Sequence, residues 1–199
     1  DPDGDRLSIV SNSGKAIGEE FTLVLAAMSF DMHINAYIAK YIFLQSDPKL
    51  SPTTLVTNLS TLVTNLSTSQ MIDYHRYASV YPVLRSKIGE AHVVKKMQSI
   101  GSIFGGEGNG GVIFKNAHLG RDSLVGAAFI LKLLIHDWNK DASCIDNEAE
   151  PPSEIYFGKS NVLLKTIDEI IDNIPSYIFI KDKIKIDESI NFDSLATVF

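Results

Sequence analysis

The sequence predicts an α/β fold in which helices are layered on a sheet of strands. Short segments rich in β-branched and aromatic residues alternate with segments whose apolar residues recur at helical spacing, a pattern typical of layered α/β domains. The composition, 45% hydrophobic and 21% charged in 199 residues, is that of ordinary globular protein. A helix expected at 123–138 has an extensive apolar surface, so another layer should cover it.

The elements of the first half follow from periodicity and turn residues. Leu7–Ser11 is expected to be a strand that ends in the turn Asn12–Lys15. A long helix is predicted from Gly18 to about Phe43, and Asp47-Pro48 follows it. Leu55–Leu59 has a strand pattern, and residues 68–73 are typical of a helix start with a Ser or Thr cap.

The second half begins with a strand at Tyr81–Arg85 and a short helix at Ala91–Met97. Strands at Ser102–Phe104 and Val112–Phe114 flank a glycine-rich turn. The acidic, proline-containing stretch Asp141–Ser160 indicates a linker or surface insertion. The remaining predictions are a helix at Leu163–Ile171 and strands at Tyr177–Ile180 and Ile184–Ile186.

Seven residues occur twice in succession, because Thr54–Ser60 and Thr61–Ser67 are both TLVTNLS. Side chains of a strand alternate between two faces, so a shift of seven residues reverses which of them face inward. Both copies therefore cannot serve one continuous strand in the same orientation. We expect one copy to form the strand and the other to form a loop. The alternative is that the repeat is an artefact of sequencing or assembly.

Charge and hydropathy exclude two classes of partner. The formal net charge is −6 and no basic stripe is interleaved with aromatics, which argues against nucleic-acid binding. The apolar stretches Phe21–Phe30 and Val125–Ile135 are too short to span a bilayer. The single cysteine, Cys144, excludes an internal disulfide and favours a cytoplasmic location.

The N-terminal hexapeptide Asp1-Pro2-Asp3-Gly4-Asp5-Arg6 is a shaped acidic loop. Pro2 and Gly4 favour a tight turn, so Asp1, Asp3 and Asp5 can converge on a hard cation such as Mg²⁺ or Ca²⁺. A calcium EF-hand loop is excluded, because its sixth and twelfth positions hold Arg6 and Asn12 instead of Gly and Glu. Arg6 indicates an anion nearby. The alternative is a solvated acidic segment.

A second motif is the glycine-rich segment 105–111, GGEGNGG. It formally contains G-x-G-x-x-G, but a strand follows where a dinucleotide site needs a helix, and Glu107 would repel a pyrophosphate. Glu107 and Asn109 on permissive backbone suit the hydroxyls of a neutral sugar. The alternative is a flexible hairpin turn.

In order along the chain, five motifs resemble those of the α-D-phosphohexomutase family, which includes phosphoglucosamine mutase, phosphomannomutase and phosphoglucomutase. The matching segments are the metal loop Asp1–Arg6, the strand-to-helix step Val63–Ser69, Lys87–Glu90, the sugar-recognition loop Gly105–Phe114 and Gly120-Arg121-Asp122. The resemblance implies a mixed sheet layered with helices and a division into four parts. These are the end of a second domain (1–16), a sugar-binding third domain (17–140), a linker (141–162) and the start of a fourth domain (163–199).

The resemblance also implies roles for individual residues. Mg²⁺ would be held by Asp1, Asp3 and Asp5, with Arg6 supporting a phosphate. The residues expected to bind a phosphosugar are Gly106, Glu107, Gly108, Asn109, Lys87, Gly89, Glu90, Arg121 and Asp122. Family members interconvert hexose 1-phosphates and 6-phosphates through a phosphoserine and a bisphosphorylated sugar. His118 lies beside the last motif and is a weaker candidate.

Two family motifs are missing, the T-A-S-H-N-P loop of the phosphoserine and the phosphate-binding R-x-S-G-T-E-P loop of the fourth domain. We therefore expect a fragment that acts with the remaining domains of a longer chain and is inactive alone. The resemblance implies phosphoglucosamine mutase or phosphomannomutase/phosphoglucomutase activity, and motifs like GGEGNGG belong most often to phosphoglucosamine mutases. The alternative function is a non-catalytic sugar- or metal-binding module of the same fold.

Overall fold

A computed structural model describes residues 1–31, 57–74, 82–135, 166–175 and 177. Its centre is a four-stranded sheet in the order β2-β1-β3-β4. The strands are β1 (Leu62–Asn65), β2 (Val83–Ser86), β3 (Phe104–Glu107) and β4 (Gly111–Phe114). β1 pairs in parallel with β2 and β3, whereas β3 and β4 are antiparallel. The predicted mixed α/β fold is confirmed.

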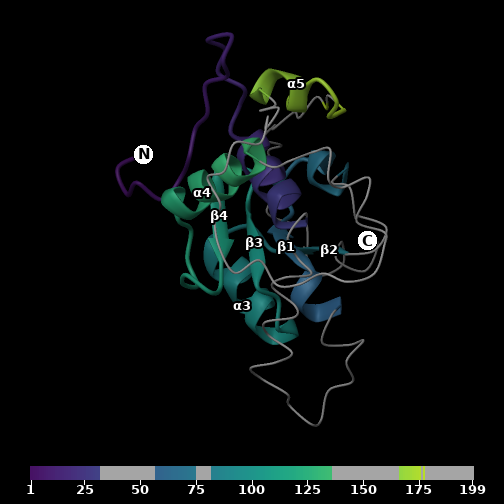
Figure 1. The fold of residues 1–199 in the computed structure, drawn as a ribbon. Coiled ribbons are helices and arrows are strands. Elements are labelled where there is room, and N and C mark those ends of the chain that lie inside the picture. Colours follow the sequence, from purple (N-terminus) through teal and green to yellow (C-terminus); the bar gives the residue numbers. More distant parts are fainter. Residues whose placement is uncertain (32–56, 75–81, 136–165, 176, 178–199) are drawn as a thin grey trace, which may run out of the picture.

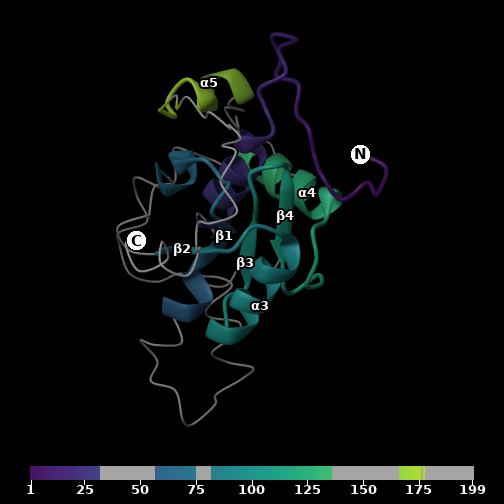
Figure 2. The same cartoon turned by 180° about the vertical axis from the view of Figure 1, so that it is seen from behind.

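Helices cover both faces of this sheet (Figures 1 and 2). Alternate side chains of a strand face opposite ways, and accordingly Val63 packs with α3 (Glu90–Ile100) while Leu62 joins the larger core cluster. That larger cluster contains side chains of the helical segment 20–31, of α4 (Ser123–Leu134) and of α5 (Ile167–Ile171). Its aromatic centre is Phe30 stacked on Phe104, with ring centroids 4.5 Å apart.

Local signals start and end these helices. Asp122 caps α4, because its Oδ1 accepts hydrogen bonds from the amides of Leu124 and Val125 at 2.8 and 3.0 Å. Thr166 and Glu169 form a reciprocal capping box at α5. Gly101 ends α3 in the left-handed conformation, with φ at 80°.

The N-terminal segment differs from its prediction. Leu7–Ser11 is not a strand; a single bridge joins Val10 to Ala16 around the turn. The turn docks on α5 instead, where Ser13 donates from its backbone amide and hydroxyl to Asp168 at 2.9 and 3.2 Å. Hydrogen bonds from Ser11 and then Ser13 hold the pKa of Asp168 below its ordinary value. Alternation of apolar residues therefore did not suffice, because no neighbouring strand pairs with this segment among the described residues.

The two repeat copies adopt different structures. The second copy, Thr61–Ser67, contains β1, as the prediction of one strand copy requires. Residues 57–60 of the first copy are helical. The strand predicted at Leu55–Leu59 is therefore wrong over residues 57–59. The loop predicted for the copy that does not form the strand is likewise wrong over residues 57–60. The earlier part of that copy lies outside the described residues.

Other elements begin or end a few residues away from their predicted positions. The expected helix start at 68–73 is a 3₁₀ helix, η1 (Gln70–Tyr74), and the expected glycine loop is shorter, because Gly105, Gly106 and Glu107 belong to β3. Predictions for residues 32–43, 141–160 and 178–186 lie outside the described part, as does Cys144. No helix within the described residues is long and apolar enough to cross a membrane.

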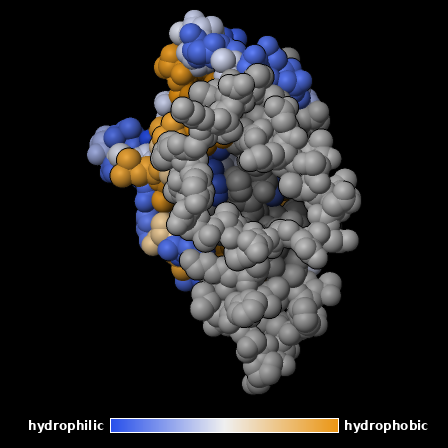
Figure 3. Space-filling model, viewed as in Figure 1, coloured by the Kyte–Doolittle hydropathy of each residue, from blue (hydrophilic) through white to orange (hydrophobic). Residues whose placement is uncertain are grey.

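Hydrophobic side chains also reach the surface along the N-terminal segment and α4 (Figure 3). Leu124, Leu131 and Ile135 are 78%, 62% and 59% exposed. Their spacing places them on one side of the helix, opposite the buried Phe129, Ile130 and Leu133.

Candidate functional site

The glycine-rich segment is a tight hairpin, with Glu107 paired to Gly111 across a three-residue tip. Packing explains its glycines. A Cβ on Gly108 would lie 2.2 Å from Oε2 of Glu20, and one on Gly110, whose φ is +89°, would lie 2.6 Å from the carbonyl of Leu7. The hairpin is therefore held on both sides by the N-terminal part of the chain.

Glu107 lies at the base of this hairpin and is 4% exposed. Oε1 accepts a 2.5 Å hydrogen bond from the amide of Asn65, and Oε2 accepts from Asn109 at 3.3 Å. Arg121 donates to the same Oε2 at 3.1 Å. A buried carboxylate needs such partners, so Glu107 here organises the side chains around it.

Arg121 joins four segments of the molecule. Its guanidinium contacts Asp5 Oδ2 at 2.7 Å, Glu90 Oε2 at 3.1 Å and Glu107 Oε2 at 3.1 Å. The backbone amide of Arg121 also donates to Glu90 Oε1 at 3.0 Å. The structure thus brings together four residues that the sequence proposed for two different sites.

The acidic loop makes ion pairs in this arrangement. Asp1 pairs with Arg6, Asp5 pairs with Arg121, and Asp3 is exposed. The described residues contain no cluster of three carboxylate, histidine or cysteine side chains close enough to hold a metal. Oδ1 of Asp5 is nevertheless buried without a hydrogen-bond partner. Arg6 Nε lies 3.9 Å from it, and carboxylate oxygens of this kind are the donor atoms that a hard divalent cation prefers.

A cavity of about 340 Å³ separates the acidic loop from the hairpin. It is lined by Asp1, Arg6, Leu7, Ser8, Glu19 and Asn109. Beside it, the amide of Leu7 donates to the carbonyl of Gly110 at 3.0 Å, which ties the two motifs together. One guanidinium, two carboxylates and one side-chain amide therefore face one space suited to a polar ligand.

Other residues that the sequence predicts for the site do not line this cavity. Lys87 is exposed and Gly89, with φ at 113°, precedes α3; neither is among the described residues that line this cavity. Asp122 caps α4, as described above. His118 Nδ1 lies 3.6 Å from Oδ2 of Asp122, on an exposed side chain.

Sequence reasoning missed a polar network beneath the hairpin. Thr68 Oγ1 accepts from the Gly108 amide at 3.0 Å and from Thr64 Oγ1 at 2.7 Å, and it donates to Asn65 Oδ1 at 3.0 Å. Glu20 accepts from the amide of Ser69 at 3.1 Å. The run of Asn, Ser and Thr directly after β1 was the available signal, because such side chains bind local backbone at strand ends.

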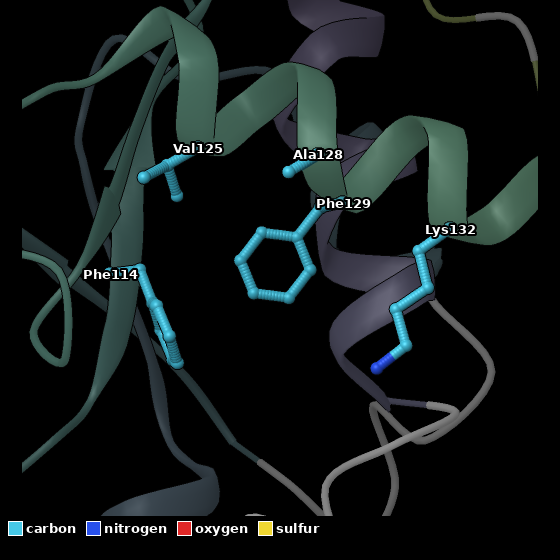
Figure 4. A pocket seen from close by; sticks show the side chains of 5 residues that line it. All are labelled: Phe114, Val125, Ala128, Phe129 and Lys132. Carbon is cyan, nitrogen blue, oxygen red and sulfur yellow. The ribbon is translucent and has the colours of Figure 1, made fainter. Parts of the chain in front are cut away.

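A second cavity, of about 190 Å³, lies between α4 and β4 (Figure 4). Phe114, Val125, Ala128 and Phe129 line it, together with Lys132. Burial lowers the pKa of the Lys132 ammonium. The rings of Phe114 and Phe129 meet edge to face, with centroids 5.2 Å apart, and Phe114 and Val125 pack against the core cluster that contains Phe129.

Comparison with known proteins gives a consistent result. The family described as phosphoglucomutase/phosphomannomutase, alpha/beta/alpha domain III, matches residues 32–151, more than half of the chain. A phosphoglucosamine mutase of Methanococcus vannielii is 25% identical over 184 residues, which cover 92% of this chain and 30% of that protein.

Two further relatives agree. A phosphoglucosamine mutase of Ruthia magnifica is 28% identical over 136 residues, 68% of this chain and 26% of the relative. A phosphoglucomutase/phosphomannomutase of Thermococcus kodakarensis is 29% identical over 146 residues, 73% of this chain and 27% of the relative. The chain thus spans under a third of the length of these relatives.

Proposed function

The chain belongs to the phosphoglucomutase/phosphomannomutase family, and we propose that it supplies the sugar-binding third domain, with parts of its neighbours, to a Mg²⁺-dependent phosphohexose mutase. The reaction interconverts hexose 1-phosphate and 6-phosphate through a phosphoserine and a bisphosphorylated sugar. The phosphoserine would come from another part of a longer chain. The proposed domain boundaries are those given above, at residues 16, 140 and 162.

One observation carries this proposal. The acidic loop and the glycine hairpin, separated by about a hundred residues of sequence, line one cavity and are linked through Leu7 and Gly110. Long-range convergence of two motifs is not expected of a solvated acidic segment or of a simple turn. It favours a single site that takes a charged, hydroxylated ligand.

The proposed roles follow from the chemistry of each side chain. Asp1, Asp3 and Asp5 would hold Mg²⁺, which when bound neutralises charge on a phosphoryl group. Arg6 would bind phosphate oxygens through its guanidinium. Asn109, which lines the cavity, would donate to a sugar hydroxyl.

The role that we propose for Glu107 differs from the direct contact with a sugar hydroxyl that the sequence predicts. Both of its oxygens are engaged by Asn65, Asn109 and Arg121. Its proposed role is to orient Asn109 toward the ligand, with direct contact to a hydroxyl still a prediction. Lys87, Gly89 and Glu90 would border the wider cleft that the remaining domains complete.

Calorimetric titration of the chain in Mg²⁺ with glucosamine-, mannose- and glucose-phosphates tests the proposal. We expect saturable binding, strongest for glucosamine phosphate, and about five- to thirtyfold weaker binding by Asn109→Ala, since a lost polar partner costs on the order of 1–2 kcal/mol. Asn116→Ala, on an exposed turn after β4, is the matched control. The chain alone should show no turnover.

Each outcome has a definite meaning. Equal binding by both variants would remove the hairpin from the site. Binding of sugar phosphates by a longer natural chain that shows no mutase turnover would favour the non-catalytic module. Turnover by this chain alone would contradict the need for a phosphoserine from elsewhere.

A further inference from the structure

Arg121 has an unusual set of neighbours for one guanidinium. Asp5, Glu90 and Glu107 all contact it within 3.1 Å, and its side chain is only 16% exposed. The three carboxylates come from the acidic loop, the start of α3 and the end of β3. Side chains from three separate segments are therefore held by one residue.

The backbone around Arg121 is built to keep it there. A bridge pairs Arg121 with Ile113 of β4, and its amide donates to Glu90. A Cβ on Gly111 would lie 2.3 Å from Cδ of Arg121, so the side chain crosses the hairpin where only a glycine leaves room. The position of the guanidinium is thus determined by the hairpin itself.

Chemistry explains why arginine is needed at this point. Its planar fork offers five N–H donors in several directions, whereas a lysine ammonium is a compact point charge. Each of Nε, Nη1 and Nη2 here contacts a different carboxylate. A lysine would keep the charge but could not span all three acceptors, and an uncharged residue would leave the buried Glu107 without its cationic partner.

We propose that Arg121 is a positioning residue that clamps the acidic loop onto the glycine hairpin, rather than a residue that contacts the sugar. It holds Oδ2 of Asp5 and leaves the buried Oδ1 without a hydrogen bond. Binding of a cation to the acidic loop would then change the stability of the hairpin through the contacts of Arg121 with Asp5 and Glu107. This linkage rests on the proposed function; the clamp itself does not.

Amide hydrogen exchange measured by NMR tests the clamp without any metal. In Arg121→Lys, we expect the Leu7 amide, which bonds Gly110, to exchange at least about tenfold faster, because the contact between loop and hairpin opens locally. Arg85→Lys is the matched control. Arg85 is 22% exposed and bonds Asp73 and the carbonyl of Thr68, and among the described residues it makes no ion pair with Asp5, Glu90 or Glu107. Unchanged Leu7 exchange in Arg121→Lys, or equal acceleration in both variants, would overturn the clamp.

The linkage is tested by adding Mg²⁺ and following both binding and exchange. In the unaltered chain we expect Mg²⁺ to slow exchange at the Gly110 and Gly111 amides. Arg121→Lys should still bind Mg²⁺ by calorimetry but lose that slowing, which a merely structural role would not produce. Slowing that persists in Arg121→Lys overturns the linkage. Absence of Mg²⁺ binding to the unaltered chain instead refutes the metal part of the proposed function, and the metal-free comparison still decides the clamp.

Discussion

The two copies of TLVTNLS have identical residues but adopt different structures. In the second copy Leu62–Asn65 forms the central strand β1, whereas residues 57–60 of the first copy are helical. Leu59 of the first copy is 3% exposed, and its counterpart Leu66 is 66% exposed. The residues of the two copies are the same, so the different structures must come from what surrounds each copy.

The polar residues of the repeat diverge in the same way. Asn65 is 1% exposed and bonds Glu107, whereas its counterpart Asn58 is half-buried. The first copy contributes Leu59 to the core, whereas the second contributes Leu62 and Val63 to the two core clusters and Asn65 to the polar network of the site. Each pair of equivalent residues in the two copies is therefore a built-in comparison of one residue type in two surroundings.

The largest difference is expected for the leucines. Leu59→Ala should lower the free energy of unfolding by about 3 kcal/mol, because it leaves a cavity in the main core. Leu66→Ala should change it by less than about 0.5 kcal/mol, since most of that side chain is already in water. Urea denaturation of both variants measures the pair. Equal losses would mean that the two copies are equivalent in the folded protein.

The asparagines should differ by somewhat less. Asn65→Ala removes a hydrogen bond to the buried carboxylate of Glu107 and should cost about 2 kcal/mol. Asn58→Ala should cost less than about 0.5 kcal/mol. The same denaturation experiment applies, and NMR shifts of the hairpin amides should move in the first variant alone. Movement of these shifts in Asn58→Ala would show that the first copy also supports the site.

The smallest difference is expected for the threonines. Thr64→Val keeps the shape of a fully buried side chain but removes its 2.7 Å hydrogen bond to Thr68, at a cost of about 1 kcal/mol. Thr57→Val, on an exposed residue, should have a smaller effect. If Thr64→Val were neutral, the network under the hairpin would contribute little to stability.

Much of the fold could be predicted, because periodicity and turn residues report on local structure. The strands near 83, 104 and 112 and the helices at 90 and 123 lie within a few residues of their predicted positions. The failures at Leu7–Ser11 and 57–59 share one cause. Alternation in the first segment and β-branched residues in the second are compatible with a strand. A strand also needs a partner, and the sequence pattern does not show which segments pair.

The site was predicted in parts rather than as a whole. Asp5, Glu90, Glu107 and Arg121 were each selected from motifs, and the structure shows that they contact one another. Asn65 and Thr68 were missed as site residues, because buried hydrogen bonds between distant segments leave no periodic signal. Motifs identify the residue types, whereas their mutual contacts depend on the tertiary fold.

The docking of Ser13 on Asp168 has a consequence for biosynthesis. These residues are 155 positions apart, and Ile170 and Ile174 of the same region complete the main core. At roughly 5–20 residues per second, a ribosome needs on the order of 8–30 s to make the intervening chain. During that time the nascent chain exposes apolar side chains of its unfinished core. This is the interval in which a chaperone would bind the chain.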